Sequence, residues 1–278
     1  MKPWAAVIGS PIQHSLSPVL HSCAFELADL DWDFRRVEVT GETLPSFMEG
    51  LDSQCVGLAI TMPCKQSVIP FLDTVDALAK NVGAVNTCVV AGGLLAGFNT
   101  DVHGIVETIR DEMPGRSITG GNGKKAVILG TGATASSALA ALTSLKFDHI
   151  TVIGRSFAGA GNVLQAGGRL GADFDPLLWH HSHQVERVCH DTDVLISTIP
   201  PHATEALAVA LKPRSNQLLL DVTYGSGTSP LTTSFRKSGG RVLSPLRMLA
   251  YQGLAQDKLW SGIEVPFEPV YHAIKNAA

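Results

Sequence analysis

Apolar and polar positions alternate over short distances in the first hundred residues. Short apolar or alternating runs predict strands, and they occupy residues 4–9, 34–39, 56–61, 84–90 and 94–98. Residues 18–30, between the first two runs, carry apolar side chains at helical spacing, and residues 101–112 also read as a helix. The order strand, helix, strand at the N-terminus predicts a β-α-β unit.

The apolar runs of the second half are continuous rather than alternating. Strands are expected at residues 126–130, 150–154, 193–198 and 217–221, separated by helix-length segments such as 133–145 and 202–212. Continuous apolarity is typical of strands buried on both faces, as in a parallel sheet between layers of helices. The expected fold class is α/β, with a Rossmann-like, doubly wound domain in this half.

Two further segments bear on domain organisation. Residues 113–125 are rich in Gly, Pro and polar side chains, which is typical of a linker, so a domain boundary is expected between residues 102 and 124. A strongly periodic helix is expected over 244–262, with Pro245 near its first turn and Gly262 past its end.

Composition and charge exclude several classes of function. Of 278 residues, 45% are hydrophobic and 17% are charged, which is ample for sizeable cores. The net charge of -4 comes with no basic run longer than two residues, so no nucleic-acid partner is expected. Because no apolar window approaches the length of a membrane span and no secretory signal precedes Pro11, we expect no membrane partner and a cytoplasmic location.

Cysteine and histidine spacing argues against disulfides and metal sites. No Cys-x-x-Cys pair occurs among the cysteines, which we expect to be buried as small apolar residues: Cys23, Cys55, Cys64, Cys88 and Cys189. His180, His181 and His183 lack the spacing of zinc ligands and a companion carboxylate, so we interpret them as a solvated helix end and expect no metal.

A glycine motif follows the first predicted strand of the second half. Gly130, Gly132 and Ala135 fit the pattern G-x-G-x-x-A between a strand and a helix. The first glycine permits a tight turn, the second lets a pyrophosphate approach the backbone, and the helix start offers free N–H groups to phosphates. The motif predicts a dinucleotide site; an ordinary strand-helix turn is the alternative.

The end of the next predicted strand indicates which dinucleotide is bound. A site for NAD would place Asp or Glu there to accept a hydrogen bond from the ribose 2'-hydroxyl, whereas this strand ends in Arg155 and Ser156, with no acid before Asp173. A guanidinium suits a 2'-phosphate through bidentate hydrogen bonds. We therefore expect NADP(H), with an exposed arginine of no such role as the alternative.

Polar side chains with suitable chemistry cluster near the ends of the first-half strands. Ligands of open α/β sheets bind at such positions, and the candidates are Ser15, Ser17, Thr61, Lys65, Asn86, Asn99 and Asp101. Oxidation of a carbinol by hydride transfer requires a proton carrier nearby. Each residue alone also has an ordinary interpretation: Ser15, Ser17 and Asp101 as helix caps, and Lys65 as a surface charge.

Taken together and in order, the motifs resemble those of one family, the shikimate dehydrogenases, which reduce 3-dehydroshikimate to shikimate with NADPH. The resemblance covers essentially the whole chain: GSPIQHSLSP, TMPCK, GAVNT, NTD, GTGAT, DVTYGSGTSPL and MLAYQGLAQDKLWSG. It implies an N-terminal substrate-binding and catalytic domain of residues 1–103, completed by helices in 246–278, and a dinucleotide-binding domain of residues 104–245. The substrate would lie between the two domains, in a monomer or homodimer.

The resemblance also implies a role for individual residues. It assigns the substrate carboxylate to Ser15 and Ser17 with Tyr224 nearby, and other substrate contacts to Thr61, Asn86 and Gln252. Lys65 and Asp101 match the catalytic pair. The expected cofactor contacts are Gly130, Gly132, Ala133, Arg155, Ser156 and Thr198.

The charges of the catalytic pair suit the reducing direction. A carboxylate beside Lys65 favours the protonated amine, which can stabilise a developing alkoxide and donate a proton to it. In the oxidising direction Lys65 must accept a proton. Two ways of making it a base are compatible with the sequence: desolvation of its amine, or transfer of its proton toward Asp101.

Some positions depart from the family pattern and leave rivals open. Gly159 stands where a second basic residue is common, and Ile196-Ser197-Thr198 replaces Asn-Ala-Thr, so only Thr198 is retained there. The nearest rival is an NAD-dependent quinate or shikimate dehydrogenase, and Ser17 and Arg155 speak against it. A non-catalytic NADP(H)-sensing protein is a rival of another class, which the retained Lys65 and Asp101 disfavour.

Overall fold

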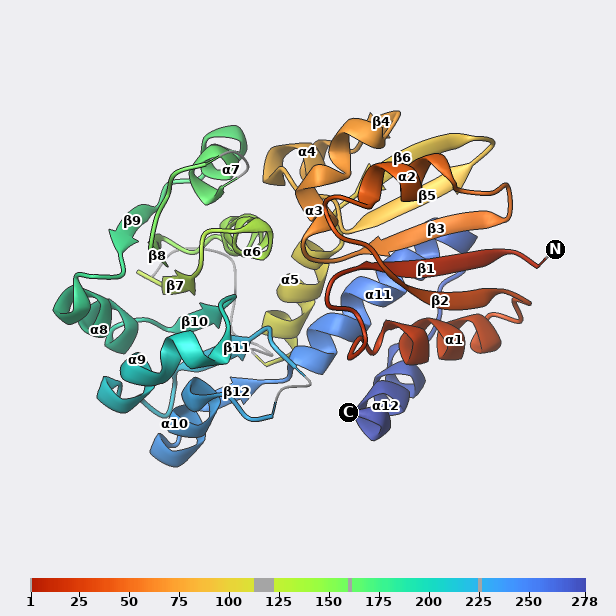
Figure 1. Cartoon of the computed structure of the whole chain (residues 1–278). Coiled ribbons are helices and arrows are strands. Elements are labelled where there is room, and N and C mark those ends of the chain that lie inside the picture. Colours follow the sequence, from red (N-terminus) through yellow and green to blue (C-terminus); the bar gives the residue numbers. More distant parts are fainter. Residues whose placement is uncertain (1, 113–122, 160–161, 225–226) are drawn as a thin grey trace. The chain divides into compact units, whose positions relative to one another are not determined.

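The computed structural model describes residues 2–112, 123–159, 162–224 and 227–278 (Figure 1). The chain divides into two compact units, Met1–Gly104 with Leu249–Ala278, and Ile105–Met248. Most of the linker predicted at 113–125 lies outside the described residues. No helix in the described part of the chain is both long enough and apolar enough to cross a membrane.

The first unit is built on a mixed sheet with the strand order β2-β1-β3-β5-β6-β4. Its strands are β1 Trp4–Gly9, β2 Asp33–Glu38, β3 Cys55–Ile60, β4 Thr74–Val75, β5 Thr87–Ala91 and β6 Leu94–Phe98. Its helical elements are α1 Ser17–Leu27, α2 Leu44–Glu49, α3 Cys64–Ser67, η1 Ile69–Phe71, α4 Ala77–Val82 and α12 Phe267–Ala277. The helices α5 Asp101–Asp111 and α11 Pro245–Ser261 each belong partly to this unit and partly to the second.

The inner strand β1 is buried on both faces of this sheet, which explains its composition. In β1, Trp4, Ala6 and Ile8 join one apolar cluster with residues of α2 and α3. Ala5 and Val7 join another cluster, which includes residues of α1 and α11. Because successive side chains of a strand point to opposite faces, a strand covered on both sides must be apolar throughout.

The C-terminal part of α11 packs against this sheet. The indole N–H of Trp260 donates to the carbonyl oxygen of Cys88 in β5 at 2.9 Å. His21 of α1 and Asp257 of α11 form a buried pair with 2.7 Å between Nδ1 and Oδ1, and burial raises the pKa of the Asp257 carboxyl while His21 opposes the shift. The prediction that the C-terminal helices return to the N-terminal domain is confirmed.

The second unit contains a fully parallel sheet of order β12-β11-β10-β7-β8-β9. Its strands are β7 Lys125–Leu129, β8 His149–Gly154, β9 Asp175–Leu178, β10 Val194–Ser197, β11 Leu218–Asp221 and β12 Arg241–Leu243. Its helical elements are α6 Ala133–Ser144, α7 Val163–Leu170, α8 Ser182–His190, η2 Pro201–Thr204, α9 Glu205–Ala210 and α10 Pro230–Ser238. This order is that of the Rossmann fold, with its topological switch point between β7 and β10, and it confirms the predicted fold class.

Several predicted boundaries need correction. The helix predicted over 202–212 is divided into η2 and the short helix α9, which ends at Ala210. Leu211 is already extended, two residues before Pro213, which cannot continue a helix. The strand predicted over 84–90 begins only at Thr87. Asn86 therefore precedes its strand rather than following one, which changes how it reaches the site.

Candidate active site

The candidate substrate residues of the first unit lie along one edge of its sheet. Strands β1, β3 and β6 run in the same direction, so the segments that follow them, residues 10–17, 61–65 and 99–101, leave the sheet at the same edge. Strand β5 runs antiparallel to both of its neighbours. Its first residue therefore lies at that edge too, and Asn86 joins the other candidates because it comes before an antiparallel strand.

The segments after β1 and β3 are in direct contact. Ser10 N–H donates to the carbonyl oxygen of Met62 at 2.8 Å, and Thr61 N–H donates to that of Ile8 at 2.9 Å. Gly9 has φ +155°, and a Cβ there would lie 2.4 Å from Thr61 Cγ2. Only glycine permits this approach of the two segments, which brings Thr61 beside the turn that leads to Ser15.

Ser15 and Ser17 form a small donor site at the start of α1. The backbone N–H of Ser17 donates to Ser15 Oγ at 3.2 Å, which places the Ser15 hydroxyl beside the backbone of Ser17. Within the described residues, no group accepts a hydrogen bond from either hydroxyl. Both hydroxyls can therefore donate to an anion at the N-terminus of an 11-residue helix, where negative charge is favoured.

Lys65 and Asp101 form a close ion pair, with 2.5 Å between Nζ and Oδ2. Lys65 belongs to the short helix α3 and Asp101 is the first residue of α5. Asn99 Oδ1 accepts from the N–H of Val102 in the manner of a cap, so Asp101 is not needed for that purpose. The pair leaves two ammonium hydrogens of Lys65 without an acceptor in the described part of the chain.

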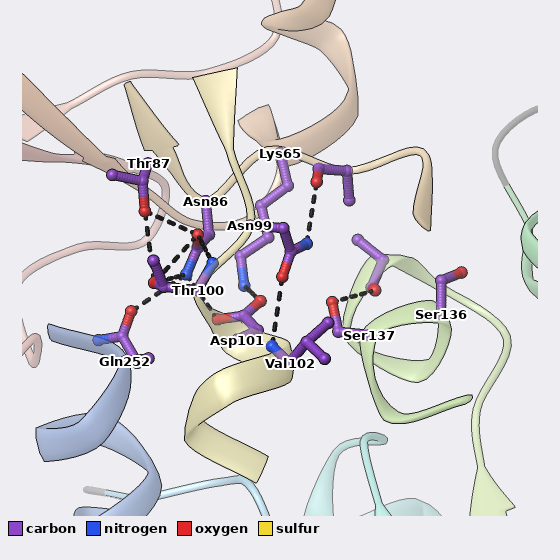
Figure 2. A network of polar contacts seen from close by, with 12 residues as sticks. Lys65, Asn86, Thr87, Asn99, Thr100, Asp101, Val102, Ser136, Ser137 and Gln252 are labelled. Carbon is purple, nitrogen blue, oxygen red and sulfur yellow. Dashed lines mark hydrogen bonds and ion pairs between the residues drawn. The ribbon is translucent and has the colours of Figure 1, made fainter. Parts of the chain in front are cut away.

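The other oxygen of Asp101 is held by Asn86, whose side-chain amide is the centre of a polar network (Figure 2). Asn86 Oδ1 accepts from the backbone N–H of Thr100 at 2.7 Å and from the Thr87 hydroxyl at 2.8 Å. Because a backbone N–H can only donate, this contact fixes the orientation of the amide. Nδ2 must then face Asp101 Oδ1, at 2.9 Å.

The same nitrogen connects the sheet edge to α11. Asn86 Nδ2 lies 2.9 Å from Thr100 Oγ1 and 3.1 Å from Gln252 Oε1, in addition to Asp101. Two N–H groups thus face three acceptors, so one acceptor remains able to receive a hydrogen from another molecule. Gln252, at the longest of the three distances, is the acceptor most readily released.

Sequence reasoning missed three members of this network. They are Thr87, Thr100 and Gln256. Gln256 Nε2 donates to the backbone oxygen of Asn86 and to Thr87 Oγ1, at 2.8 and 3.1 Å. Gln256 follows Gln252 by one helical turn, and this i, i+4 spacing was the available signal.

The glycine motif of the second unit lies at the switch point of its sheet. Gly130 follows β7 with φ +117°, and a Cβ there would lie 2.2 Å from Thr198 Oγ1, which follows β10. Gly132 is the N-cap of α6, has open space where a Cβ would be, and is followed directly by Ala133. No acidic residue and no capping side chain occupy the first turn of this 12-residue helix, so its N–H groups fit a diphosphate.

Arg155 and Ser156 come directly after β8 and are exposed. Arg155 has no hydrogen-bond or ion-pair partner in the described part of the chain. All five of its N–H groups are thus available to an anion. Ser156 Oγ accepts from the N–H of Ala158 at 3.1 Å and keeps its own hydrogen.

Thr198 follows β10 directly, and Tyr224 lies three residues after the end of β11. The hydroxyl of Thr198 donates to the carbonyl oxygen of Leu129 at 2.7 Å, which stabilises the turn at the end of β7. Its oxygen can still accept a hydrogen bond. Tyr224 is half-buried just after β11.

The cysteines have no place in this chemistry. Burial raises the pKa of Cys55, Cys88 and Cys189 to about 12 each, so these thiols stay protonated at neutral pH. Four cysteines are buried, as expected, while Cys23 is half-buried.

His180, His181 and His183 are exposed at the start of α8, and the described residues contain no cluster of side chains that could hold a metal ion.

Comparisons with known proteins identify the family. The model of the shikimate dehydrogenase substrate binding domain matches residues 7–88, and that of the shikimate 5'-dehydrogenase C-terminal domain matches residues 246–275. The chain is 31% identical to the "Shikimate dehydrogenase (NADP(+))" of Ignicoccus hospitalis over 97% of each chain. The chain belongs to the shikimate dehydrogenase family.

Solved structures agree with this family membership. The shikimate dehydrogenase of Mycobacterium tuberculosis superposes with a TM-score of 0.86 at 32% identity over 99% of each chain. A shikimate 5-dehydrogenase of Listeria monocytogenes in complex with shikimate and NAD has a TM-score of 0.82 at 25% identity, over 99% of this chain and 96% of that one. The resemblance inferred from the sequence motifs is confirmed.

The central position of Asn86 leads to a stability prediction. Asn86→Asp replaces Nδ2 by an oxygen that faces Asp101 Oδ1 and Gln252 Oε1, and we expect a loss of about 2–4 kcal/mol in the free energy of unfolding at pH 7. The Asp101 carboxylate raises the pKa of the introduced carboxyl, so the loss should shrink as the pH falls from 7 to 5. Urea unfolding followed by tryptophan fluorescence measures both values.

Asn276→Asp is the matched control, because it makes the same change at an exposed position of α12. It should alter the free energy of unfolding by less than about 0.5 kcal/mol at either pH. Equal losses for Asn86→Asp at pH 5 and pH 7 would contradict the assigned orientation of the Asn86 amide.

Proposed function

We propose that the chain catalyses the reversible, NADPH-dependent reduction of 3-dehydroshikimate to shikimate. The observation that carries the proposal is the Lys65–Asp101 pair, which lies at the same sheet edge as the Ser15–Ser17 donor site. Membership of the shikimate dehydrogenase family supports the same reaction. The reaction is the step of the shikimate pathway that leads toward chorismate and the aromatic amino acids.

In this proposal the first unit holds the substrate. The Ser15 and Ser17 hydroxyls donate to the ring carboxylate, and Tyr224 is a further residue proposed to bind the substrate. Thr61 and Gln252 contact the ring hydroxyls, since the Thr61 hydroxyl has no partner in the described part of the chain and Gln252 can be released by Asn86. Asn86 is a further substrate contact in this proposal, and its Nδ2 also holds Asp101.

Lys65 carries the proton. Bound NADPH supplies the hydride for the carbonyl carbon. As negative charge develops on the carbonyl oxygen, Lys65 donates one of its two unengaged ammonium hydrogens, and the alkoxide becomes the hydroxyl. In the oxidising direction the hydroxyl proton returns to the Lys65–Asp101 pair. Asp101 accepts hydrogen bonds at both oxygens, from Lys65 and from Asn86, and so fixes the position of the Lys65 amine.

The second unit binds the cofactor in this proposal. Gly130, Gly132 and Ala133, at the N-terminus of α6, would hold its pyrophosphate. Arg155 and Ser156 bind the 2'-phosphate. Thr198 accepts a hydrogen bond from the nicotinamide half of the cofactor. A cytoplasmic location and an assembly no larger than a homodimer complete the proposal.

A single assay tests the reaction and its rivals. Purified protein is mixed with shikimate or quinate, each with NADP+ or NAD+, and formation of reduced nicotinamide is followed by absorbance. We expect the highest kcat/KM for shikimate with NADP+. Turnover of quinate with NAD+ at a higher kcat/KM would favour the NAD-dependent quinate or shikimate dehydrogenase. No turnover in any combination would contradict the proposed reaction and favour the non-catalytic NADP(H)-sensing protein.

Removal of the amine should affect catalysis more than binding. We expect Lys65→Ala to lower kcat at least about 100-fold while the KM for shikimate changes much less. Lys80→Ala, on the exposed surface of α4, is the control and should leave both constants unchanged. A small change in kcat with a large rise in KM would mean that Lys65 only binds the substrate.

The role of Arg155 can be tested by charge reversal. Arg155→Asp should raise the KM for NADP+ far more than that for NAD+, because only NADP+ carries the 2'-phosphate. Lys212→Asp makes the same change in charge at an exposed position of the same unit and should not discriminate between the cofactors. Equal effects of Arg155→Asp on the two KM values would refute the assignment.

A further inference from the structure

Arg36 holds the turn that carries the Ser15–Ser17 donor site. Its Nε and Nη2 both donate to the carbonyl oxygen of Ser15, at 3.2 and 2.8 Å. Arg36 belongs to β2, which pairs with β1 in parallel register and places Arg36 opposite Val7. The guanidinium therefore reaches the segment after β1 from the neighbouring strand.

Alternation along β2 explains why Arg36 and not Arg35 reaches this turn. Phe34 shares a face with Arg36, and its ring stacks on that of His21 in α1, with 4.3 Å between centroids. Arg35 points to the opposite face, where its guanidinium lies 4.4 Å from the centre of the Trp4 ring. The two arginines carry the same charge, but only one of them is directed toward α1 and Ser15.

The charge of Arg36 is not neutralised by a neighbouring carboxylate. Within the described residues Arg36 forms no ion pair and makes no hydrogen bond other than the two to Ser15. The nearest acid along the same face of β2 is Glu38, which accepts from the Ser10 hydroxyl at 2.7 Å. Three guanidinium N–H groups remain available to solvent or a ligand.

A carboxylate bound at Ser15 and Ser17 is stabilised by such a charge. The two hydroxyls are neutral, and the positive charge of Lys65 is matched by Asp101 at 2.5 Å. The start of α1 contributes a partial positive charge only. The guanidinium of Arg36, which is hydrogen-bonded to the carbonyl oxygen of Ser15, supplies a full positive charge beside this turn.

We propose that Arg36 is a specificity-determining and positioning residue: it fixes the Ser15 turn and supplies the positive potential by which the site selects a ring acid over its uncharged analogue. The inference rests on the proposed function, in which Ser15 and Ser17 receive the substrate carboxylate. Arg36 acts through electrostatic attraction and through the Ser15 backbone, without taking part in proton transfer.

The test compares shikimate with its methyl ester, which has the same ring and no charge. Arg36→Gln removes the charge and retains an amide donor for the Ser15 carbonyl oxygen, and Arg36→Lys retains the charge without the planar fork. Arg35→Gln, one residue away on the opposite face, is the matched control for the change in net charge.

We expect Arg36→Gln to raise the KM for shikimate about tenfold, with kcat and the KM for NADP+ changed less than about threefold. The preference for shikimate over the methyl ester, measured as the ratio of kcat/KM values, should fall by a similar factor. Arg36→Lys should retain most of this preference. In the wild type the KM for shikimate should rise with salt concentration, and in Arg36→Gln this dependence should be weaker.

An unchanged preference in Arg36→Gln, or an equal fall in Arg35→Gln, would overturn the inference. A merely structural role for Arg36 predicts that KM rises equally for shikimate and for the ester, which would also overturn it. These outcomes differ from failure of the proposed function, in which the wild-type protein turns over no shikimate at all.

Discussion

The amide of Asn86 is the constraint on which the candidate site depends. A buried amide must satisfy both its oxygen and its nitrogen, since an unpaired polar group in the interior costs about 1–3 kcal/mol. The Thr100 N–H occupies the oxygen, so the nitrogen must serve Asp101 and Gln252. One side chain thereby joins the start of β5, the start of α5 and the C-terminal part of α11, and it fixes the carboxylate that holds Lys65.

The reversal of one strand makes this arrangement possible. In a fully parallel sheet, only residues that follow strands meet at the carboxyl edge. Because β5 is antiparallel in the first unit, a residue before a strand joins those after β3 and β6. The fully parallel sheet of the second unit lacks such a residue, and its candidate ligand groups come from the turns after β7, β8, β10 and β11.

Sequence patterns predict the candidate groups of the site but not the contacts between them. The spacing of apolar residues predicted β1, β3, β7 and α11 closely. The three strands are buried almost throughout, and one side of α11 is buried at helical spacing. Short elements such as α3, β4 and β9 contain too few residues for a period to be measured. Contacts such as Arg36 with Ser15, or Gln256 with Asn86, depend on strand register and helix rotation, which no local pattern encodes.

Uncommitted hydrogens separate the groups that can donate to a ligand from those that can only accept a hydrogen bond from it or that hold the site together. Asn86 and the Thr198 hydroxyl have their hydrogens engaged, whereas Ser17, Thr61 and Lys65 retain free ones. The same distinction applies to charge. Lys65 is neutralised by Asp101 and is therefore suited to transfer a proton rather than to attract an anion. Attraction of anions is left to cations without a carboxylate partner, and Arg36 and Arg155 are such cations on separate units. In the proposed function, the ring acid and the cofactor phosphate would thus be drawn to different units, and neither charge would be bound by Lys65.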